Sequence, residues 1–257
     1  GWKRSRMELD LAGKVVLITG SSRGLGAAIA AAFIDELSYV VINGRTAEGT
    51  EKTARALGER AVSMPADMTQ PAACEALIDR LLAQHGRLDV LVCNVGSGVS
   101  ARPGQETASA WHDSIAINLY STTNIVHAAA DALEMSNGSV VCISSICGHA
   151  AVPGAPVTYS ASKAGLNAFV KGIARPFADR SIRINAVSPG NLLFAGSVWD
   201  QKQADDPAAV EAMLYQEVAL KRLGKAEEIA NFVLFLASER ASFATGAVFT
   251  VDGGQVR

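Results

Sequence analysis

Short runs of apolar, β-branched residues alternate with longer stretches of helical periodicity along nearly the whole 257-residue chain. The apolar runs lie at 14–19, 39–43, 61–64, 89–93, 139–144, 182–187 and 247–251. Between them, apolar residues recur at helical spacing over 24–37, 46–57, 71–85, 108–133 and 158–177. Strands that alternate with helices form parallel sheets through right-handed crossovers, with helices on both faces. The sequence therefore predicts an α/β fold around one doubly wound parallel sheet of about seven strands.

One stretch departs from this alternation. Residues 191–222 mix aromatic residues with acids, and 207–217 has the pattern of a helix. Long ordered insertions in compact domains often form lids or binding loops, and the alternative is a surface excursion or a subunit contact. We expect a lid insertion at about 191–222 in a single domain over 9–257. Residues 1–8 are expected to be a flexible N-terminal extension.

Charge and composition exclude several classes of function. The formal net charge is -2, and the body of the chain has no run of Lys or Arg that would attract nucleic acid or anionic lipid. No apolar run approaches the roughly 18 to 20 residues that cross a bilayer. The four cysteines form no CxxC pair and the four histidines no HxxxH pair, so neither a disulfide framework nor a metal site is indicated. We expect a cytoplasmic protein with no nucleic-acid or membrane partner.

A glycine-rich turn joins the first predicted strand to the first predicted helix. It contains Gly20, Gly24 and Gly26 in the spacing G-x-x-x-G-x-G. Glycines let such a turn close tightly and let a pyrophosphate approach the backbone amides at the positive end of the helix. A glycine-rich turn alone is weak evidence, but its place between strand and helix predicts a dinucleotide site.

The end of the second predicted strand bears on which dinucleotide is bound. NAD sites usually place an acid there, whereas NADP sites carry basic groups for the 2′-phosphate. The strand ends in Asn43-Gly44-Arg45, with no carboxylate before Glu48. Because Arg23 and Arg45 could both reach a phosphate, we predict NADP(H) rather than NAD(H). The alternative is that Arg45 only begins a solvated helix face.

Tyr159 and Lys163 form an i, i+4 pair in a predicted helix, so their side chains share one face. A free Tyr has a pKa of about 10, and a nearby cation lowers it by roughly 1 to 3 units. The pair is therefore a candidate for proton transfer. A surface Tyr above a solvated Lys is the alternative, since YxxxK also arises by chance.

In this order and spacing, the motifs resemble those of the short-chain dehydrogenase/reductase family from about residue 9 onward. The matching segments are Thr19 to Gly26 (TGxxxGxG), Cys93-Asn94-Val95-Gly96 (NNAG), Tyr159 to Lys163 (YxxxK), Ser188-Pro189-Gly190, Arg222-Leu223-Gly224 and Val251 to Gly254. The tail and turn motifs resemble 3-oxoacyl-[acyl-carrier-protein] reductases. The resemblance implies a single-domain Rossmann-type fold and a homotetramer.

The resemblance also implies roles for individual residues. Asn118, Ser145, Tyr159 and Lys163 correspond to the catalytic residues. The expected cofactor-binding residues are Gly20, Ser22, Arg23, Gly24, Leu25, Gly26, Asn43, Arg45, Asp67, Met68, Asn94, Val95, Gly96, Tyr159, Lys163, Pro189 and Gly190. The substrate is expected to meet Ser145, Tyr159 and, from the lid, Trp199.

Three positions depart from the family pattern. Cys93 replaces an Asn and Val95 an Ala in NNAG, which should change hydrogen bonding and narrow the space beside the cofactor. Ser145 precedes Tyr159 by fourteen residues, where thirteen is commoner, so Ser144 is a competing candidate. We expect Ser145 to be the catalytic serine because the family uses the second Ser of such a pair.

These observations predict an NADP(H)-dependent oxidoreductase that transfers a hydride between the nicotinamide and a small-molecule carbonyl or secondary alcohol. The resemblance implies a 3-oxoacyl thioester or a related ketone as the substrate. The alternatives are a sugar or nucleotide-sugar dehydrogenase of the same fold, and a cofactor-binding regulator without turnover.

Overall fold

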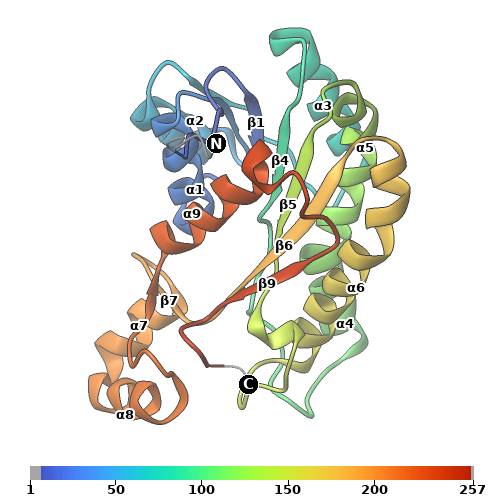
Figure 1. Ribbon diagram of the computed structural model, residues 1–257. Helices are drawn as coiled ribbons and strands as arrows, with labels where there is room; N and C mark the ends of the chain where they lie inside the picture. The colour runs from blue at the N-terminus through green and yellow to red at the C-terminus, as the bar shows by residue number, and fades with distance from the viewer. Residues whose placement is uncertain (1–6, 256–257) are drawn as a thin grey trace.

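Seven strands form one sheet in the order β3-β2-β1-β4-β5-β6-β9, and every pair of neighbours is parallel (Figure 1). The computed structural model describes residues 7–255. The strands are β1 (Val15–Ile18), β2 (Tyr39–Ile42), β3 (Ala61–Ser63), β4 (Val90–Cys93), β5 (Ser139–Ile143), β6 (Arg183–Pro189) and β9 (Val248–Val251). The order reverses beside β1, between β1 and β4, which is where doubly wound sheets bind ligands.

Helices cover both faces of the sheet, as the alternating pattern predicts. On one face lie α1 (Gly24–Asp35), α2 (Ala47–Leu57) and α9 (Ala226–Ala237); on the other lie α3 (Pro71–His85), α4 (Ala108–Ile115), α5 (Ser121–Met135) and α6 (Val157–Asp179) (Figure 1). Thr46 caps α2 by accepting a hydrogen bond from the Gly49 N–H, and Pro71 opens α3, where its missing N–H costs nothing.

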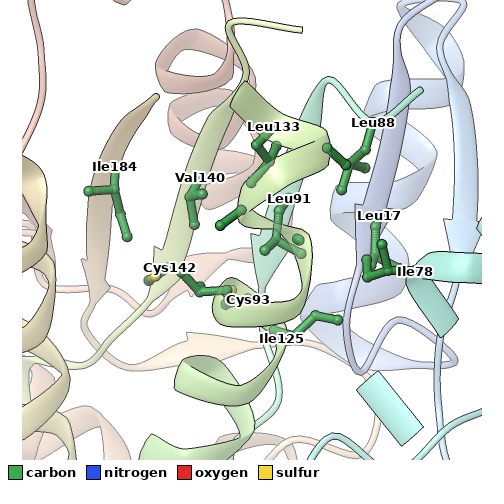
Figure 2. Packing of buried hydrophobic residues seen from close by; sticks show 14 of the residues in the cluster. Leu17, Ile78, Leu88, Leu91, Cys93, Ile125, Leu133, Val140, Cys142 and Ile184 are labelled. Carbon is green, nitrogen blue, oxygen red and sulfur yellow. The ribbon is translucent and has the colours of Figure 1, made fainter. Parts of the chain in front are cut away.

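Successive strand residues point to opposite faces and build two cores. Leu17, Leu91 and Val140 pack beneath α3, α5 and α6 (Figure 2), whereas Ile18 and Val92 pack beneath α1 and α9. Burial of the sheet on both faces explains why its strands read as continuous apolar runs. The carboxyl ends of all seven strands are thereby held at one edge of the sheet.

The long helix expected over 108–133 is interrupted, which corrects the prediction. A π-helical turn at Ala116–Tyr120 separates α4 from α5. The cause is Asn118, whose Nδ2 donates a hydrogen bond of 3.0 Å to the carbonyl of Ser114 and so competes with the backbone for that acceptor. Asn118 is thereby aimed at the carboxyl edge of the sheet.

The lid insertion of residues 191–222 contains two helices, α7 (Val198–Asp205) and α8 (Pro207–Glu217). A short ladder of β7 (Leu192–Leu193) with β8 (Gly224–Lys225) closes its base. No residue of α7 is buried, and Val210 is the buried residue of α8. In Figure 1 the two helices extend from the lower left of the molecule, across from α6.

The ends of the chain and its cysteines add little to the site. Leu9 packs against the core beneath α1 and α9, and residues 1–6 of the expected extension lie outside the described residues. Between residues 7 and 255, no helix has the length and apolarity to span a bilayer. The same part of the chain holds no cluster of three His, Cys, Asp or Glu side chains suited to a metal. All four cysteines are free thiols.

Candidate active site

The glycine-rich turn after β1 is held in shape by two asparagines. Asn43 is fully buried; its Oδ1 accepts a hydrogen bond from the Gly20 N–H (3.2 Å), and its Nδ2 donates to the carbonyls of Met64 and Ala66. Asn94, after β4, donates from Nδ2 to the carbonyls of Thr19 (3.2 Å) and Gly20 (2.9 Å). Their side chains thus fix the shape of the turn, and contact of either residue with a cofactor stays a prediction.

Gly26 is required by packing. A Cβ atom at this position would lie 2.4 Å from the Gly20 carbonyl oxygen and 2.5 Å from Asn94 Nδ2. Gly20 and Gly24 have φ angles of +61° and +59°, which glycine adopts without strain. Packing thus requires glycine at position 26, and the backbone conformation favours it at positions 20 and 24.

The first turn of α1 offers N–H donors suited to a pyrophosphate. Within residues 7–255 the N–H groups of Gly24, Leu25 and Gly26 have no hydrogen-bond acceptor, and the Arg23 side chain makes no capping bond. Unpaired donors at the positive end of a helix bind anions. The residues present therefore fit the phosphates of a dinucleotide.

Basic side chains stand beside this turn. Arg23 and Arg45 are exposed, and neither guanidinium has a hydrogen bond or an ion pair with another residue in the described part of the chain. Ser22 is close to both, because a Cβ atom on Gly44 would lie 3.0 Å from Ser22 Oγ. This end of the site presents two free cations and a hydroxyl.

Asp67 and Met68 differ in what they offer a ligand. Asp67 follows β3 and accepts two hydrogen bonds from Thr69, through its N–H (2.9 Å) and its Oγ1 (2.8 Å). The Met68 side chain is buried in the core, where it contacts the Cys74 thiol. Any contact of Met68 with a cofactor would thus be made by its backbone.

Ser145 and Tyr159 meet at the carboxyl end of β5. Burial raises the pKa of Tyr159, while a hydrogen bond with the Ser145 side chain lowers it and the nearby Cys147 raises it further. The competing Ser144 points elsewhere, since its Oγ donates to Asn167 Oδ1 at 2.6 Å in the interior. The geometry thus favours Ser145 over Ser144 as the partner of Tyr159.

Lys163 lies one turn after Tyr159 on α6 and is almost completely buried. Its Nζ donates a hydrogen bond of 2.9 Å to the Ile143 carbonyl and lies 5.8 Å from the centre of the Tyr159 ring. Burial lowers the pKa of Lys163 from its ordinary value of 10.5 to about 8. The expectation that Lys163 lowers the pKa of Tyr159 is not met in this structure, because burial of the phenol outweighs the other influences.

Asn118 and Gly96 complete the group around Lys163. A Cβ atom on Gly96 would lie 3.0 Å from Asn118 Oδ1 and 3.2 Å from Lys163 Nζ. The preceding residue, Val95, lies next to the glycine-rich turn, because a Cβ atom on Gly20 would lie 3.1 Å from Val95 Cγ2. The segment Asn94 to Gly96 thus joins the glycine-rich turn to the Lys163 group.

Three further expected residues lie around this edge of the sheet. Pro189 ends β6, and the Gly190 N–H donates to the Val251 carbonyl at 3.0 Å. Trp199 lies on α7, where Lys202 Nζ stands 4.4 Å from the centre of its ring. No hydrogen bond or ring interaction joins Trp199 to Ser145 or Tyr159 among the described residues, so its part in binding a substrate stays a prediction.

Residues that the motifs did not identify also shape the site. Ser97 holds both ends of the Asn118 amide, with its N–H donating to Oδ1 (2.9 Å) and its carbonyl accepting from Nδ2 (3.0 Å). Cys147 lies close enough to Tyr159 and Lys163 to influence the pKa of each. These contacts depend on loop backbone, for which the sequence carries no signal beyond position after a strand.

The sequence is similar to curated enzymes over nearly its full length. Residues 20–255 match a family model described as enoyl-(acyl carrier protein) reductase. Glucose 1-dehydrogenase 2 of Bacillus subtilis is 36% identical over 96% of this chain and 96% of its own length. The 3-oxoacyl-[acyl-carrier-protein] reductase FabG of Escherichia coli is 33% identical over 96% of this chain and 98% of its own.

Solved structures with a similar fold include complexes with NADPH and with NADH. L-sorbose reductase from Gluconobacter frateurii, complexed with NADPH and L-sorbose, superposes with a TM-score of 0.91 at 27% identity, covering 98% of this chain and 99% of that one. A 7α-hydroxysteroid dehydrogenase complexed with NADH and 7-oxo glycochenodeoxycholic acid gives a TM-score of 0.87 at 28% identity, with 96% of each chain covered.

Proposed function

The chain belongs to the short-chain dehydrogenase/reductase family, and from this membership we propose that it is an NADP(H)-dependent oxidoreductase acting on a carbonyl or secondary alcohol. The observation that carries the proposal is the grouping of Ser145, Tyr159 and Lys163 at the carboxyl edge of the sheet, joined through Asn94 to Gly96 to the glycine-rich turn. When bound, the nicotinamide supplies or accepts the hydride.

The proton for this reaction is assigned to Tyr159. Reduction of a carbonyl develops negative charge on its oxygen, which a positioned acid must neutralise. The raised pKa of Tyr159 keeps the phenol protonated, so it can donate to that oxygen, and Ser145 can donate a second hydrogen bond to the same atom. Together the two hydroxyls fix where the substrate oxygen lies.

Lys163 is assigned to the proton supply of Tyr159 and to the nicotinamide ribose. With a pKa of about 8 it carries its charge at neutral pH and loses it in mildly alkaline solution. The family resemblance assigns Asn118 to a water that links Lys163 to solvent, and the bonds from Ser97 to the Asn118 amide support a fixed orientation for it. Activity in the reducing direction should therefore decline as the pH rises through about 8.

The preference for NADP(H) rests on Ser22, Arg23 and Arg45. Two exposed guanidinium groups without partners in the described residues suit a 2′-phosphate, and no carboxylate follows β2 before Glu48. The amides of α1 would hold the pyrophosphate. Neighbouring structures include both NADPH and NADH complexes, so the preference has to be measured.

The proposed substrate is a 3-oxoacyl thioester or related ketone, with a sugar as the second candidate. The similarity to a 3-oxoacyl-[acyl-carrier-protein] reductase supports the first, and the similarities to a glucose dehydrogenase and an L-sorbose reductase support the second. The exposed apolar residues Val198, Tyr215 and Leu220 of the lid suit an apolar substrate. We further propose that the protein is a cytoplasmic homotetramer, and light scattering of the purified protein tests the tetramer.

The test follows absorbance at the reduced nicotinamide band with NADPH or NADH and a panel of β-ketoacyl thioesters, ketosugars and cyclic ketones. Tyr159→Phe is the matched control, because it removes the acidic proton and keeps the ring. We expect it to lose about 10²- to 10⁴-fold in turnover while it still binds NADPH. A fully active Phe variant would remove Tyr159 from the mechanism. Binding of NADPH without oxidation across the panel would favour a regulator without turnover.

A further inference from the structure

The aromatic ring of Phe194 covers the start of α1. A Cβ atom on Gly24 would lie 3.0 Å from Phe194 Cε2 and 3.7 Å from both Cδ2 and Cζ, so three ring atoms face this glycine. Gly24 is the first residue of α1, and its N–H is one of the donors without an acceptor in residues 7–255. An apolar ring therefore lies against the surface that the dinucleotide phosphates need.

Phe194 is also attached to the lid. It stands between β7 and α7, and its N–H donates to Ser197 Oγ at 3.3 Å, while its carbonyl accepts from the Ser197 N–H at 2.9 Å. Ser197 is the N-cap of α7, since its Oγ accepts from the Asp200 N–H at 3.1 Å. The backbone of Phe194 is thus hydrogen-bonded to the residue that begins α7.

The lid itself offers little resistance to such a displacement. None of the residues of α7 is buried, and Val210 supplies the buried side chain of α8. Elements with few buried contacts open at low free-energy cost. Beyond the β7–β8 ladder at its base, the lid meets the start of α1 through the ring of Phe194.

We propose that Phe194 is a positioning residue that gates the dinucleotide site, and that the pyrophosphate displaces its ring from Gly24 and moves α7 with it. A phenyl ring and a phosphate group cannot occupy the same space above Gly24. The ring-covered state holds part of the protein in a form that cannot bind, so the apparent Kd equals the intrinsic Kd divided by the fraction of protein in the open form. The inference rests on the proposed function, since it requires a dinucleotide at this turn.

The first test measures the affinity for NADPH by its fluorescence in wild type and Phe194→Ala. Removal of the ring should tighten binding by about 3- to 10-fold. Leu193→Ala is the matched control, because it shortens the neighbouring apolar side chain of β7, which is not among the atoms nearest Gly24. Phe194→Leu should give an intermediate affinity, and thermal unfolding checks that each variant is folded.

A second ligand locates the effect at the pyrophosphate. Adenosine 2′-monophosphate carries the adenosine and the 2′-phosphate but no pyrophosphate, so its competition constant should be equal in wild type and Phe194→Ala. Equal tightening of both ligands would place the effect at the adenosine end and overturn the assignment to the pyrophosphate. Weaker NADPH binding by Phe194→Ala would make the ring a contact of the cofactor and overturn the gate.

Trypsin cleavage after Lys202, on α7, reports the movement of the lid. NADP⁺ should change the cleavage rate of wild type, whereas Phe194→Ala should be cleaved at nearly the same rate with and without NADP⁺. The gate is refuted if the nucleotide changes cleavage of the two proteins equally. If neither protein binds NADPH or NADH, the proposed function falls with the gate; if both bind NADPH equally, the gate alone falls.

Discussion

Replacement of Lys163 by Met should make the protein more stable at pH 7 and inactive. Lys163 is almost completely buried, and its ammonium group donates a hydrogen bond to the Ile143 carbonyl. Burial lowers its pKa from 10.5 to about 8, a difference that corresponds to about 3 kcal/mol against the charged form in the folded protein. Met keeps the length of the side chain and removes the charge.

The lost hydrogen bond to Ile143 offsets part of this gain. Such a bond contributes about 1 kcal/mol, so the free energy of unfolding should rise by about 1 to 3 kcal/mol at pH 7. For a chain of this size each kcal/mol corresponds to roughly 2 to 4 °C in melting temperature. A residue that lowers stability and is needed for turnover is typical of active sites.

The pH dependence of the unfolding free energy tests whether the buried charge of Lys163 causes the difference in stability. Because the folded pKa of Lys163 lies below the unfolded one, the unfolded chain holds more protons between pH 8 and 10.5, and the wild type gains stability as pH rises through this window. Lys163→Met cannot gain in this way, so the difference in unfolding free energy between the two proteins should shrink from pH 7 to pH 10. Other titrating groups contribute to both proteins alike.

The assay is urea unfolding of wild type, Lys163→Met and Lys171→Met at equal protein concentration and at three pH values. Lys171 is an exposed residue of the same helix, so its replacement should leave stability unchanged within about 0.5 kcal/mol. A Lys163→Met protein less stable than wild type at pH 7, or a difference that does not vary with pH, would refute the reasoning.

Two further predictions concern the cofactor site. Gly26→Ala places a Cβ atom 2.4 Å from the Gly20 carbonyl oxygen, so the turn must shift. Titration with NADPH should show binding weakened at least about tenfold. In the control Gly172→Ala the new Cβ atom meets nothing within 4 Å, so this variant should bind NADPH normally. Arg45→Ala removes an exposed guanidinium, and the KM for NADPH should rise by about tenfold while that for NADH stays constant. An equal change of both KM values would place Arg45 outside the 2′-phosphate site.

The strands could be predicted from the sequence because their apolar residues match the buried positions that they occupy. The strands Val15–Ile18 and Val90–Cys93 consist of apolar residues because helices cover both faces of the sheet. The observed strand bounds lie close to the predicted ones, and α3 and α8 match the predicted ranges 71–85 and 207–217. Periodicity suffices where burial decides the structure.

The missed features depend on contacts that no local pattern records. At the π-helical turn, the Asn118 amide bonds the Ser114 carbonyl and is also held by Ser97, which comes from another loop. Helix α7 was not predicted because it buries no residue and so has no apolar stripe, although Ser197 supplies its N-cap. The pKa of Tyr159 rises because the assembled fold buries the phenol, an effect that the spacing to Lys163 does not contain.

The departure at Cys93 had been expected to alter hydrogen bonding beside the cofactor, and its side chain instead points into the core. Cys93 is buried next to Cys142, its partner across β4 and β5 (Figure 2), and burial raises the pKa of its thiol well above the ordinary value. The neighbouring Val95 does reach the glycine-rich turn, as expected. β4 ends at Cys93, so Cys93 packs within the sheet, whereas Val95 lies in the loop that follows and meets the glycine-rich turn.

Rigidity and mobility are divided between the two sides of the site. The amides of Asn43, Asn94 and Asn118 are paired with backbone groups of the turn and the loops, and satisfied buried amides fix the groups they bind. Proton transfer needs such fixed distances, because a misplaced acid loses most of its effect. The opposite side is closed by a lid that buries little and meets the glycine-rich turn through Phe194. If the cofactor must enter from that side, weak anchoring of the lid is required for turnover, and variants that bury more of α7 should release the oxidised cofactor more slowly.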